Sequence, residues 1–351
     1  MIMVKIRLDL EKGIVDFLKK NPNSSSNEIY LAFQHIVAYA TVKRNLTLLL
    51  AKNYIEKSGK GKATKYKIST SFEVLRIIDL DNYFNDEIDD RQIYSSFNFE
   101  LIKNILPSIT IFTKEELEKL KQLQQVFYDN SNTLSKEAFN KEFERLAIDL
   151  SWKSSQIEGN TYSLLETELL LKEQQTAFGK TKDEATMLLN HKEALDFIMK
   201  NKNYLNPLKV AKIEDIHKLL IKDLGIEKNI RNRRVGISGT NYKPLDNQFQ
   251  IIEALEDMCV LVNSKENIFE KALIVLILLS YIQAFSDGNK RTARIVSNAI
   301  LINYNYCPLS FRTVDSIDYK KAMLLFYEQN NISAFKKIFI EQYEFAVNTY
   351  F

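Results

Sequence analysis

The sequence predicts a mainly α-helical protein in which a small N-terminal module precedes a larger helical body. From about Phe99 onward, apolar residues recur at helical spacing almost without interruption. Only 9 Gly and 5 Pro occur among the 351 residues, so the chain offers few sites for long loops. Hydrophobic residues make up 45% and charged residues 26%, which is typical of a soluble protein with a substantial core. A chain of this length has room for two or three domains.

The first 70 residues are expected to form three helices and two short strands. The predicted helices cover residues 11–20, 24–34 and 40–53. Alternating residues on either side of Gly59 and Gly61 predict strands at 54–57 and 65–68, joined by a lysine-rich turn. Three helices followed by such a wing resemble a winged helix-turn-helix module, and we expect it to span residues 1–70.

The charge of this N-terminal segment indicates an anionic partner. Residues 1–70 contain 13 Lys and Arg against 5 Asp and Glu, although the whole chain carries only +3. A basic module on a net-acidic body is typical of nucleic-acid binding, and the resemblance implies double-stranded DNA. The residues expected to contact DNA phosphates are Lys43, Arg44, Lys60, Lys62 and Lys65.

The rest of the chain is expected to be an acidic connector and then one helical domain. The connector and the start of the helical body are predicted at residues 71–110, and the main domain at residues 111–351. The predicted helices cover residues 113–129, 136–153, 164–176, 180–200, 209–224, 249–263, 269–284, 291–303, 319–330 and 332–345. Residues 231–241 (RNRRVGISGTN) differ, because β-branched residues and two glycines predict a short β-hairpin between helices.

Composition disfavours membrane, secreted and thiol-dependent classes of protein. The longest apolar run, residues 272–285, is shorter than the roughly 20 residues that cross a bilayer, so it predicts a buried core helix. We find no secretory signal and expect no membrane partner. Cys259 and Cys307 have no metal-binding or redox spacing, so reduced core thiols in a cytoplasmic protein are expected.

Residues 285–294 (FSDGNKRTAR) form the candidate site, because they connect an apolar helix to the start of another. Gly288 can adopt a positive φ, so that successive backbone amides point into one concavity at a helix N-terminus. Lys290 and Arg291 add full positive charges, and Arg294 lies on the same helical side as Arg291. Asp287 offers a hard oxygen ligand for Mg²⁺. These features predict a site for a di- or triphosphate and its metal ion.

This string resembles the signature of the Fic (Fido) family, His-x-Phe-x-Asp/Glu-Gly-Asn-Gly/Lys-Arg-x-x-Arg, at every defined position except the first. The resemblance extends over about residues 100–351 and implies an all-helical Fic domain that transfers AMP from ATP to a Ser, Thr or Tyr hydroxyl of a target protein. By position, Asp287 would hold Mg²⁺, and Asn289 and Arg291 would hold phosphates. Phe285 would anchor the loop in the core.

The same resemblance implies a target-binding function for the predicted hairpin. Residues 235–243 lie where Fic proteins have a flap, which pins the target chain by adding a strand beside it. The residues implied in this contact are Val235, Gly236, Ile237 and Ser238.

A second motif near residues 150–160 resembles the inhibitory motif of the family. The string Ser154-Ser155-Gln156-Ile157-Glu158-Gly159 matches Ser/Thr-x-x-x-Glu-Gly/Asn. In the family, the glutamate pairs with the second arginine of the loop, here Arg294, so that this arginine cannot bind phosphate. Ser154 lies four residues before Glu158, so both can face the site. The resemblance therefore implies a protein restrained by its own inhibitory helix.

Gln283 stands where the resemblance implies a catalytic histidine that takes the proton from the target hydroxyl. Glutamine does not titrate in the working pH range and can only form hydrogen bonds. Three interpretations stay open. The chain binds nucleotide without transferring AMP, or it transfers AMP slowly because metal and phosphate contacts supply part of the catalysis. Otherwise another group is the base, or the glutamine is an engineered change.

Two neighbouring positions also depart from the commoner family pattern. Ala284 replaces a frequent proline, and Lys290 replaces a frequent glycine. Lysine at this position resembles the Doc branch, which transfers the terminal phosphate, although other Fic branches carry it as well. A function of another class also stays open, namely a DNA-binding transcriptional regulator whose Fic domain senses nucleotide without catalysis. The sequence is compatible with a homodimer.

Overall fold

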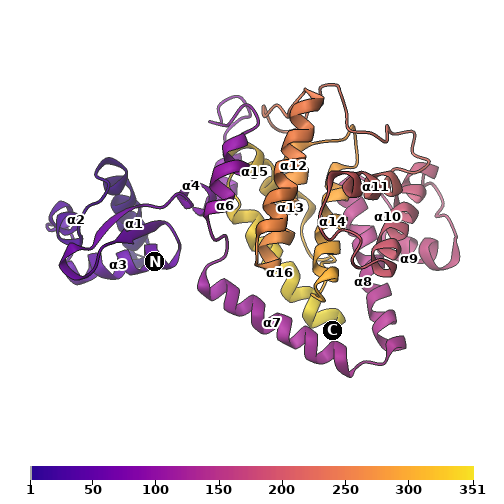
Figure 1. Cartoon of the computed structure of the whole chain (residues 1–351), viewed down its shortest axis with the longest axis horizontal. Helices are drawn as coiled ribbons and strands as arrows, with labels where there is room; N and C mark the ends of the chain where they lie inside the picture. The colour runs from indigo at the N-terminus through magenta and orange to yellow at the C-terminus, as the bar shows by residue number, and fades with distance from the viewer. Residues whose placement is uncertain (1) are drawn as a thin grey trace. The chain divides into compact units, whose positions relative to one another are not determined.

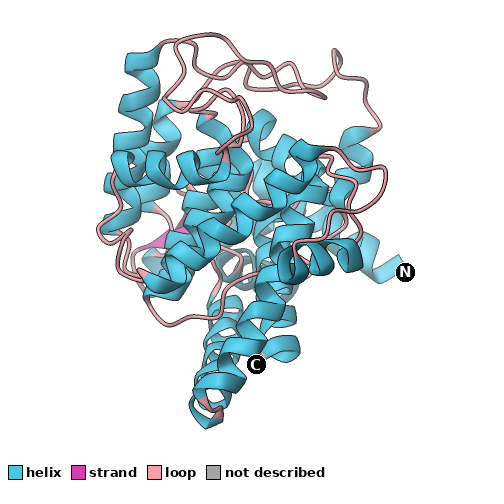
Figure 2. Ribbon diagram, turned by 90° about the vertical axis from the view of Figure 1, so that its right-hand side faces the viewer, coloured by secondary structure: helices cyan, strands magenta, loops and turns pink. Residues whose placement is uncertain are grey.

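The computed structural model describes residues 2–351, which divide into two compact units. The first unit contains the residues up to Ile77 together with Ser108–Leu117. The second contains Ile78–Pro107 and Glu118–Phe351. Helix dominates, and strand is confined to one small patch (Figure 2). The prediction of a mainly helical protein is therefore confirmed.

The first unit contains four α-helices and a two-stranded antiparallel sheet (Figure 1). Its elements are α1 (Ile2–Lys20), α2 (Ser26–Phe33), α3 (Tyr39–Ala51), β1 (Ile55–Ser58), the 3-10 turn η1 (Gly61–Ala63), β2 (Lys65–Ile68) and α4 (Phe72–Leu75). Ile55 pairs with Ile68 and Ser58 with Lys65. α2, α3, β1 and β2 lie close to their predicted positions, whereas the first helix begins at Ile2, nine residues before its predicted start at residue 11, and α4 was not predicted. The identification of a winged helix-turn-helix module stays a prediction.

Local chemistry and burial explain why the helices of this unit form. Ser25 and Glu28 make a reciprocal capping box at the start of α2, which satisfies amides that the helix leaves open. Ile14, Ile29 and Val42, one from each of α1, α2 and α3, have no exposed surface in the shared core. Removal of such side chains from water is the main source of stability in a module of this size.

After residue 77 the elements are almost all helical. They are α5 (Leu80–Phe84), the π-helical η2 (Leu101–Ile105), α6 (Leu106–Ser108), α7 (Lys114–Thr133), α8 (Lys136–Ile157), α9 (Leu164–Glu173), α10 (Lys182–Lys200), α11 (Val210–Leu220), α12 (Gln248–Ser264), α13 (Ile268–Ile282), α14 (Asn289–Asn303), α15 (Ser316–Gln329) and α16 (Ser333–Tyr350). The ten helices predicted for the body are all present, with ends displaced by about one turn.

Helix α13 is the centre of the second unit. Its residues from Phe269 to Ile282 are all buried, and α12, α14 and α15 pack against it. A helix that is apolar on every side needs such a shell of neighbours. The prediction of a buried core helix is thus confirmed. Between residues 2 and 351, no helix combines the length and hydropathy needed to cross a membrane.

The predicted connector belongs largely to the helical body. Arg91 and Glu328 form an ion pair at 3.2 Å with side chains only 3% and 1% exposed. Tyr83 donates a second hydrogen bond to the same carboxylate at 2.7 Å. Arg91 also donates to the carbonyl of Gly239 at 2.9 Å. Residues 78–107 are therefore packed structure and not a free linker, a result of long-range pairing that their acidic composition does not indicate.

The prediction of a β-hairpin at residues 231–241 is wrong. This segment, part of what we call the flap loop (residues 231–245), contains no strand. The backbone amide of Arg231 donates to Ala284, outside the segment, at 3.0 Å. Its guanidinium donates to the carbonyls of Arg233 and Leu245, one near each end of the flap loop. One buried side chain thus joins the two arms, and no strand ladder is formed.

Candidate functional site

The loop between α13 and α14 leaves several backbone amides open. Gly288 has φ +79° and is the N-cap of α14, with no side-chain cap. The amides of Asn289, Lys290 and Arg291 lie in the first turn, where a helix supplies no acceptor. We find none for them elsewhere in residues 2–351. Converging free amides at a helix N-terminus suit an anion such as phosphate.

Asn289 and Phe285 fix the shape of this loop. The Asn289 side chain accepts a hydrogen bond from the Phe285 amide at 2.8 Å and donates to the Phe285 carbonyl at 2.7 Å. The Phe285 ring is 1% exposed and stacks on His217 of α11, with centroids 3.7 Å apart and ring planes 6° apart. Phe285 therefore anchors the loop in the core, and Asn289 closes it from within.

His217 is a supporting residue beneath the loop. Its Nε2 lies 3.0 Å from the carbonyl oxygen of Asp287, which can only accept, so Nε2 carries the proton. Burial lowers the pKa of His217 to about 4, so the ring is neutral at neutral pH. A Cβ on Gly288 would lie 3.3 Å from Ile221 and 3.4 Å from His217, closer than most such contacts. The loop thus rests directly on α11 and the residue that follows it.

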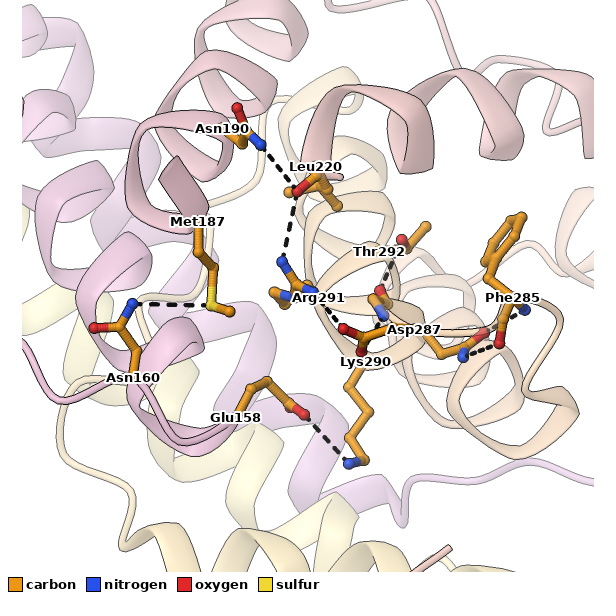
Figure 3. Close-up of polar contacts among 12 residues, drawn as sticks. Glu158, Asn160, Met187, Asn190, Leu220, Phe285, Asp287, Lys290, Arg291 and Thr292 are labelled. Carbon is orange, nitrogen blue, oxygen red and sulfur yellow. Dashed lines mark hydrogen bonds and ion pairs between the residues drawn. The ribbon is translucent and has the colours of Figure 1, made fainter. Parts of the chain in front are cut away.

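The exposed carboxylate of Asp287 pairs with the buried guanidinium of Arg291. The Asp287 side chain is 62% exposed and lies 3.3 Å from Nη2 of Arg291, which is itself 1% exposed. Arg291 also donates to the carbonyl of Leu220 at 3.5 Å, at the C-terminus of α11 (Figure 3). Its Nε has no hydrogen-bond partner among the described residues. Arg291 therefore has a donor left for a further ligand.

The Asp287 carboxylate suits a metal ion that binds together with phosphate. No group of three or more His, Cys, Asp or Glu that could hold a metal ion occurs in residues 2–351. Mg²⁺ commonly binds to one or two carboxylates together with substrate phosphates and water. The exposed carboxylate of Asp287 beside the open amides fits that arrangement.

Glu158 and Ser154 both contact Arg294, the second arginine of the loop string. Arg294 is fully buried, and its Nη2 lies 3.0 Å from Oε1 of Glu158. Its Nε donates to Oγ of Ser154 at 2.8 Å, and Nη2 donates to the Ser154 carbonyl at 2.9 Å. The expected ion pair between Glu158 and Arg294 is therefore present, and it joins the end of α8 to α14.

Gln283 is turned inward and supports the loop. It ends α13 in the left-handed conformation, with φ 52°, and is 9% exposed. Its Nε2 donates to the Ser280 carbonyl at 2.6 Å, and its Oε1 accepts from Asn289 at 3.2 Å. Both ends of the amide are thus engaged. Neither buried histidine of the body replaces a base here, because His217 bonds to Asp287 and His191 lies 3.2 Å from Ser151.

Arg231 is a site residue that the sequence alone does not reveal. It is 1% exposed, and its Nε donates to the carbonyl of Gln283 at 2.6 Å. Together with its backbone bond to Ala284, this contact ties the flap loop to the end of α13. In the sequence, Arg231 is one of three arginines in the string RNRR, and only packing distinguishes it from the exposed Arg233 and Arg234.

The remaining predicted residues belong to the flap loop and to the first unit. Val235, Gly236, Ile237 and Ser238 are partly or fully exposed in the flap loop, and we find no hydrogen bonds from their backbones to other described residues. In the first unit, Lys43 and Arg44 of α3 and Lys60 and Lys62 of the turn are exposed. Lys65 differs, because it forms an ion pair with Glu28 at 3.0 Å.

Comparison with known families and proteins agrees with this geometry. Residues 207–301 match the Fic/DOC family. This range contains the flap loop and the loop at residues 285–294 but not Glu158. The chain is similar to the protein adenylyltransferase Fic of Nematostella vectensis, with 27% identity over 255 residues, 67% of this chain and 58% of the relative. The relative of the same name in Aedes aegypti is 28% identical over 204 residues, 56% of this chain and 40% of that protein. The chain thus spans about half the length of these relatives.

Two solved structures share the fold. Fic-1 from C. elegans matches with a TM-score of 0.58 and 20% identity, over 67% of this chain and 72% of that one. A Fic family protein from Desulfovibrio desulfuricans matches with a TM-score of 0.57 and 17% identity, over 68% of this chain and 74% of that one. The family match and these likenesses together support a Fic family protein.

The buried neutral state of His217 predicts a loss of stability in mild acid. The folded-state pKa of about 4 lies below the ordinary value of 6.5, so the unfolded chain takes up the proton first as the pH falls through this window. Replacing His217 with Gln should therefore reduce the loss of unfolding free energy between pH 7 and pH 5 by about 2 kcal/mol. Urea unfolding followed by the fluorescence of Trp152, the one tryptophan, measures this quantity.

The matched control is His35→Gln, because His35 is exposed in the first unit. This variant should leave the change in unfolding free energy between pH 7 and pH 5 as it is in the wild type. Equal pH dependence in the wild type and the His217→Gln variant would mean that His217 titrates normally and does not lie neutral beneath the loop.

Proposed function

We propose, on the premise that the chain carries a Fic/DOC domain, that its loop at residues 285–294 binds ATP with Mg²⁺ and that Glu158 restrains this binding. The observation that carries the proposal is the 3.0 Å contact of Glu158 with Arg294, beside a helix N-terminus with open amides. A carboxylate and a phosphate are competing ligands for one buried guanidinium. ATP would bind fully only when Glu158 moves away.

The activity that the loop supports is transfer of AMP to a protein hydroxyl. The hydroxyl oxygen forms a bond to the α-phosphorus, and the bond from this phosphorus to the leaving pyrophosphate breaks. Asp287 would hold Mg²⁺, which neutralises developing charge on the phosphates. Asn289 keeps the loop in shape, and Arg291 and Arg294 add positive charge. The target segment would lie along the open backbone of Val235–Ser238.

Gln283 sets the expected rate. The proton of the attacking hydroxyl needs an acceptor, and the Gln283 amide cannot take it, so the proton would pass to water. General acid–base catalysis is worth roughly 10²- to 10⁴-fold, so transfer would proceed slowly from positioning and charge stabilisation alone. The inward hydrogen bonds of Gln283 support the loop that binds nucleotide. Binding would thus be retained while transfer is slowed.

A second candidate function is DNA binding by the first unit, with a Fic domain that senses nucleotide. The observation that favours it is the group of exposed cations at Lys43, Arg44, Lys60 and Lys62, for which we find no carboxylate partner among the described residues. Exposed cations on a helix and an adjacent turn can contact phosphates of a duplex without first breaking an ion pair.

The transferase proposal predicts that two substitutions together raise AMP transfer. The Glu158→Gly, Gln283→His double variant, incubated with Mg²⁺ and ATP labelled on the α-phosphate, should label itself or a partner in a cell extract at least about 100-fold faster than wild type. Glu158→Gly alone should give slow labelling, and Gln283→Ala with Glu158→Gly tests whether the added histidine is responsible. Absence of labelling in the double variant, despite ATP binding, would exclude a transferase scaffold.

The DNA-binding candidate predicts unequal effects of two neighbouring lysines. In the full chain, Lys62→Ala should weaken duplex binding. It should also make the slope of log affinity against log salt shallower by about 0.9, the value for one phosphate contact. Lys65→Ala should weaken it less, because Lys65 is paired with Glu28. Fluorescence anisotropy over a salt series measures both. Unchanged affinity after replacement of Lys43, Arg44, Lys60 and Lys62 together would contradict DNA binding by this face.

A further inference from the structure

We infer that Lys290 is a second clamp on Glu158, and that the same ammonium group binds a nucleotide phosphate once Glu158 moves away. This inference rests on the proposed function, because it concerns the regulation of the same site. It gives Lys290 two opposing effects on nucleotide binding, and which effect dominates depends on Glu158.

The two oxygens of Glu158 each contact a different cation. Oε1 lies 3.0 Å from Nη2 of Arg294. Oε2 lies 3.3 Å from Nζ of Lys290, the contact drawn in Figure 3. Lys290 and Arg294 lie four residues apart on α14, so both face the end of α8. Burial alone would raise the pKa of Glu158, but the charges of Arg294 and Lys290 outweigh it and leave the pKa below its ordinary value. The carboxylate is therefore ionised between two positive charges.

The two cations differ in what else holds them. Arg294 is 0% exposed and is also bound by the side chain and the carbonyl of Ser154, so it keeps its place without Glu158. Lys290 is 27% exposed, and Glu158 is the partner we find for its ammonium in residues 2–351. Departure of Glu158 would thus leave Lys290 as the cation without a ligand. Its flexible stem allows it to turn toward a new one.

The open polar groups nearby indicate what that new ligand is. Lys290 belongs to the first turn of α14, where we find no acceptor for its own amide or that of Arg291 among the described residues. Nη1 of Arg294 and Nε of Arg291 are buried donors without a hydrogen-bond partner among the described residues. Amides and guanidinium groups of this kind bind phosphate oxygens. A phosphate seated there would take the place of the Glu158 carboxylate against both cations.

This arrangement makes the effect of Lys290 depend on residue 158. With Glu158 present, removal of Lys290 loosens the competing carboxylate and also removes a phosphate ligand, so the two effects offset each other. With Glu158 absent, only the loss of the phosphate ligand remains. The two substitutions are therefore expected to be strongly non-additive, which a double-mutant cycle measures.

The experiment is calorimetric titration of the full chain with ATP and Mg²⁺, for wild type, Glu158→Gly, Lys290→Met and the double variant. We expect Glu158→Gly to tighten binding at least about 10-fold. Lys290→Met should change affinity less than about 2-fold in the wild type but weaken it at least about 5-fold in the Glu158→Gly background. The matched control is Lys172→Met, because Lys172 also pairs with a glutamate, Glu168, at an exposed position of α9 and should have no effect in either background.

The outcomes separate the inference from the function on which it rests. Equal weakening by Lys290→Met in both backgrounds would make Lys290 a phosphate ligand only and overturn the clamp. No weakening in the Glu158→Gly background would overturn its role toward phosphate. If Glu158→Gly binds ATP no better than wild type, the proposed restraint itself fails, whatever Lys290 does.

Discussion

The structure of this site depends on one buried guanidinium, that of Arg294. A fully buried cation is stable only when charges and hydrogen bonds replace the water that it loses. Ser154 and Glu158 supply that replacement, and in doing so they bind the end of α8 to the start of α14. Any phosphate that reaches Arg294 has to compete with Glu158. The same contact therefore contributes both to the packing of the helices and to the restraint that we propose.

Gln283 forms hydrogen bonds that hold the loop at residues 285–294 in shape. Its side chain joins Ser280 to Asn289, and Asn289 in turn holds both backbone groups of Phe285. The shape of the loop at residues 285–294 thus depends on hydrogen bonds of the Gln283 amide and not on a titratable group. Under the proposed function, nucleotide binding and proton transfer would make separate demands on this position, and glutamine would meet only the first.

Local sequence patterns predicted the helices and much of the loop at residues 285–294. The apolar run before Phe285 indicated α13, and Gly288 indicated the left-handed residue that opens α14. The spacing of Ser154 and Glu158 placed them on one helical face, where both contact Arg294. Each of these features depends on neighbours within a few turns, or on a signature long enough to identify a family.

Features that depend on distant partners could not be predicted in this way. The flap loop contains no strand, and Arg231 instead bonds to carbonyls at residues 233, 245 and 283, bonds that no periodicity in the sequence records. The packing of residues 78–107 depends on the burial of Arg91 against Glu328, more than 200 residues away. The contact of His217 with Asp287 joins residues 70 positions apart and emerges only from the fold.

A crystal structure of the Glu158→Gly variant with ATP and Mg²⁺ tests the central claim most directly. We predict nucleotide phosphates within hydrogen-bond distance of the backbone amides of Lys290 and Arg291, with a phosphate oxygen against Arg294 where the carboxylate lay. Nucleotide bound elsewhere, or amides that stay clear of any phosphate at saturating ATP, would contradict the account.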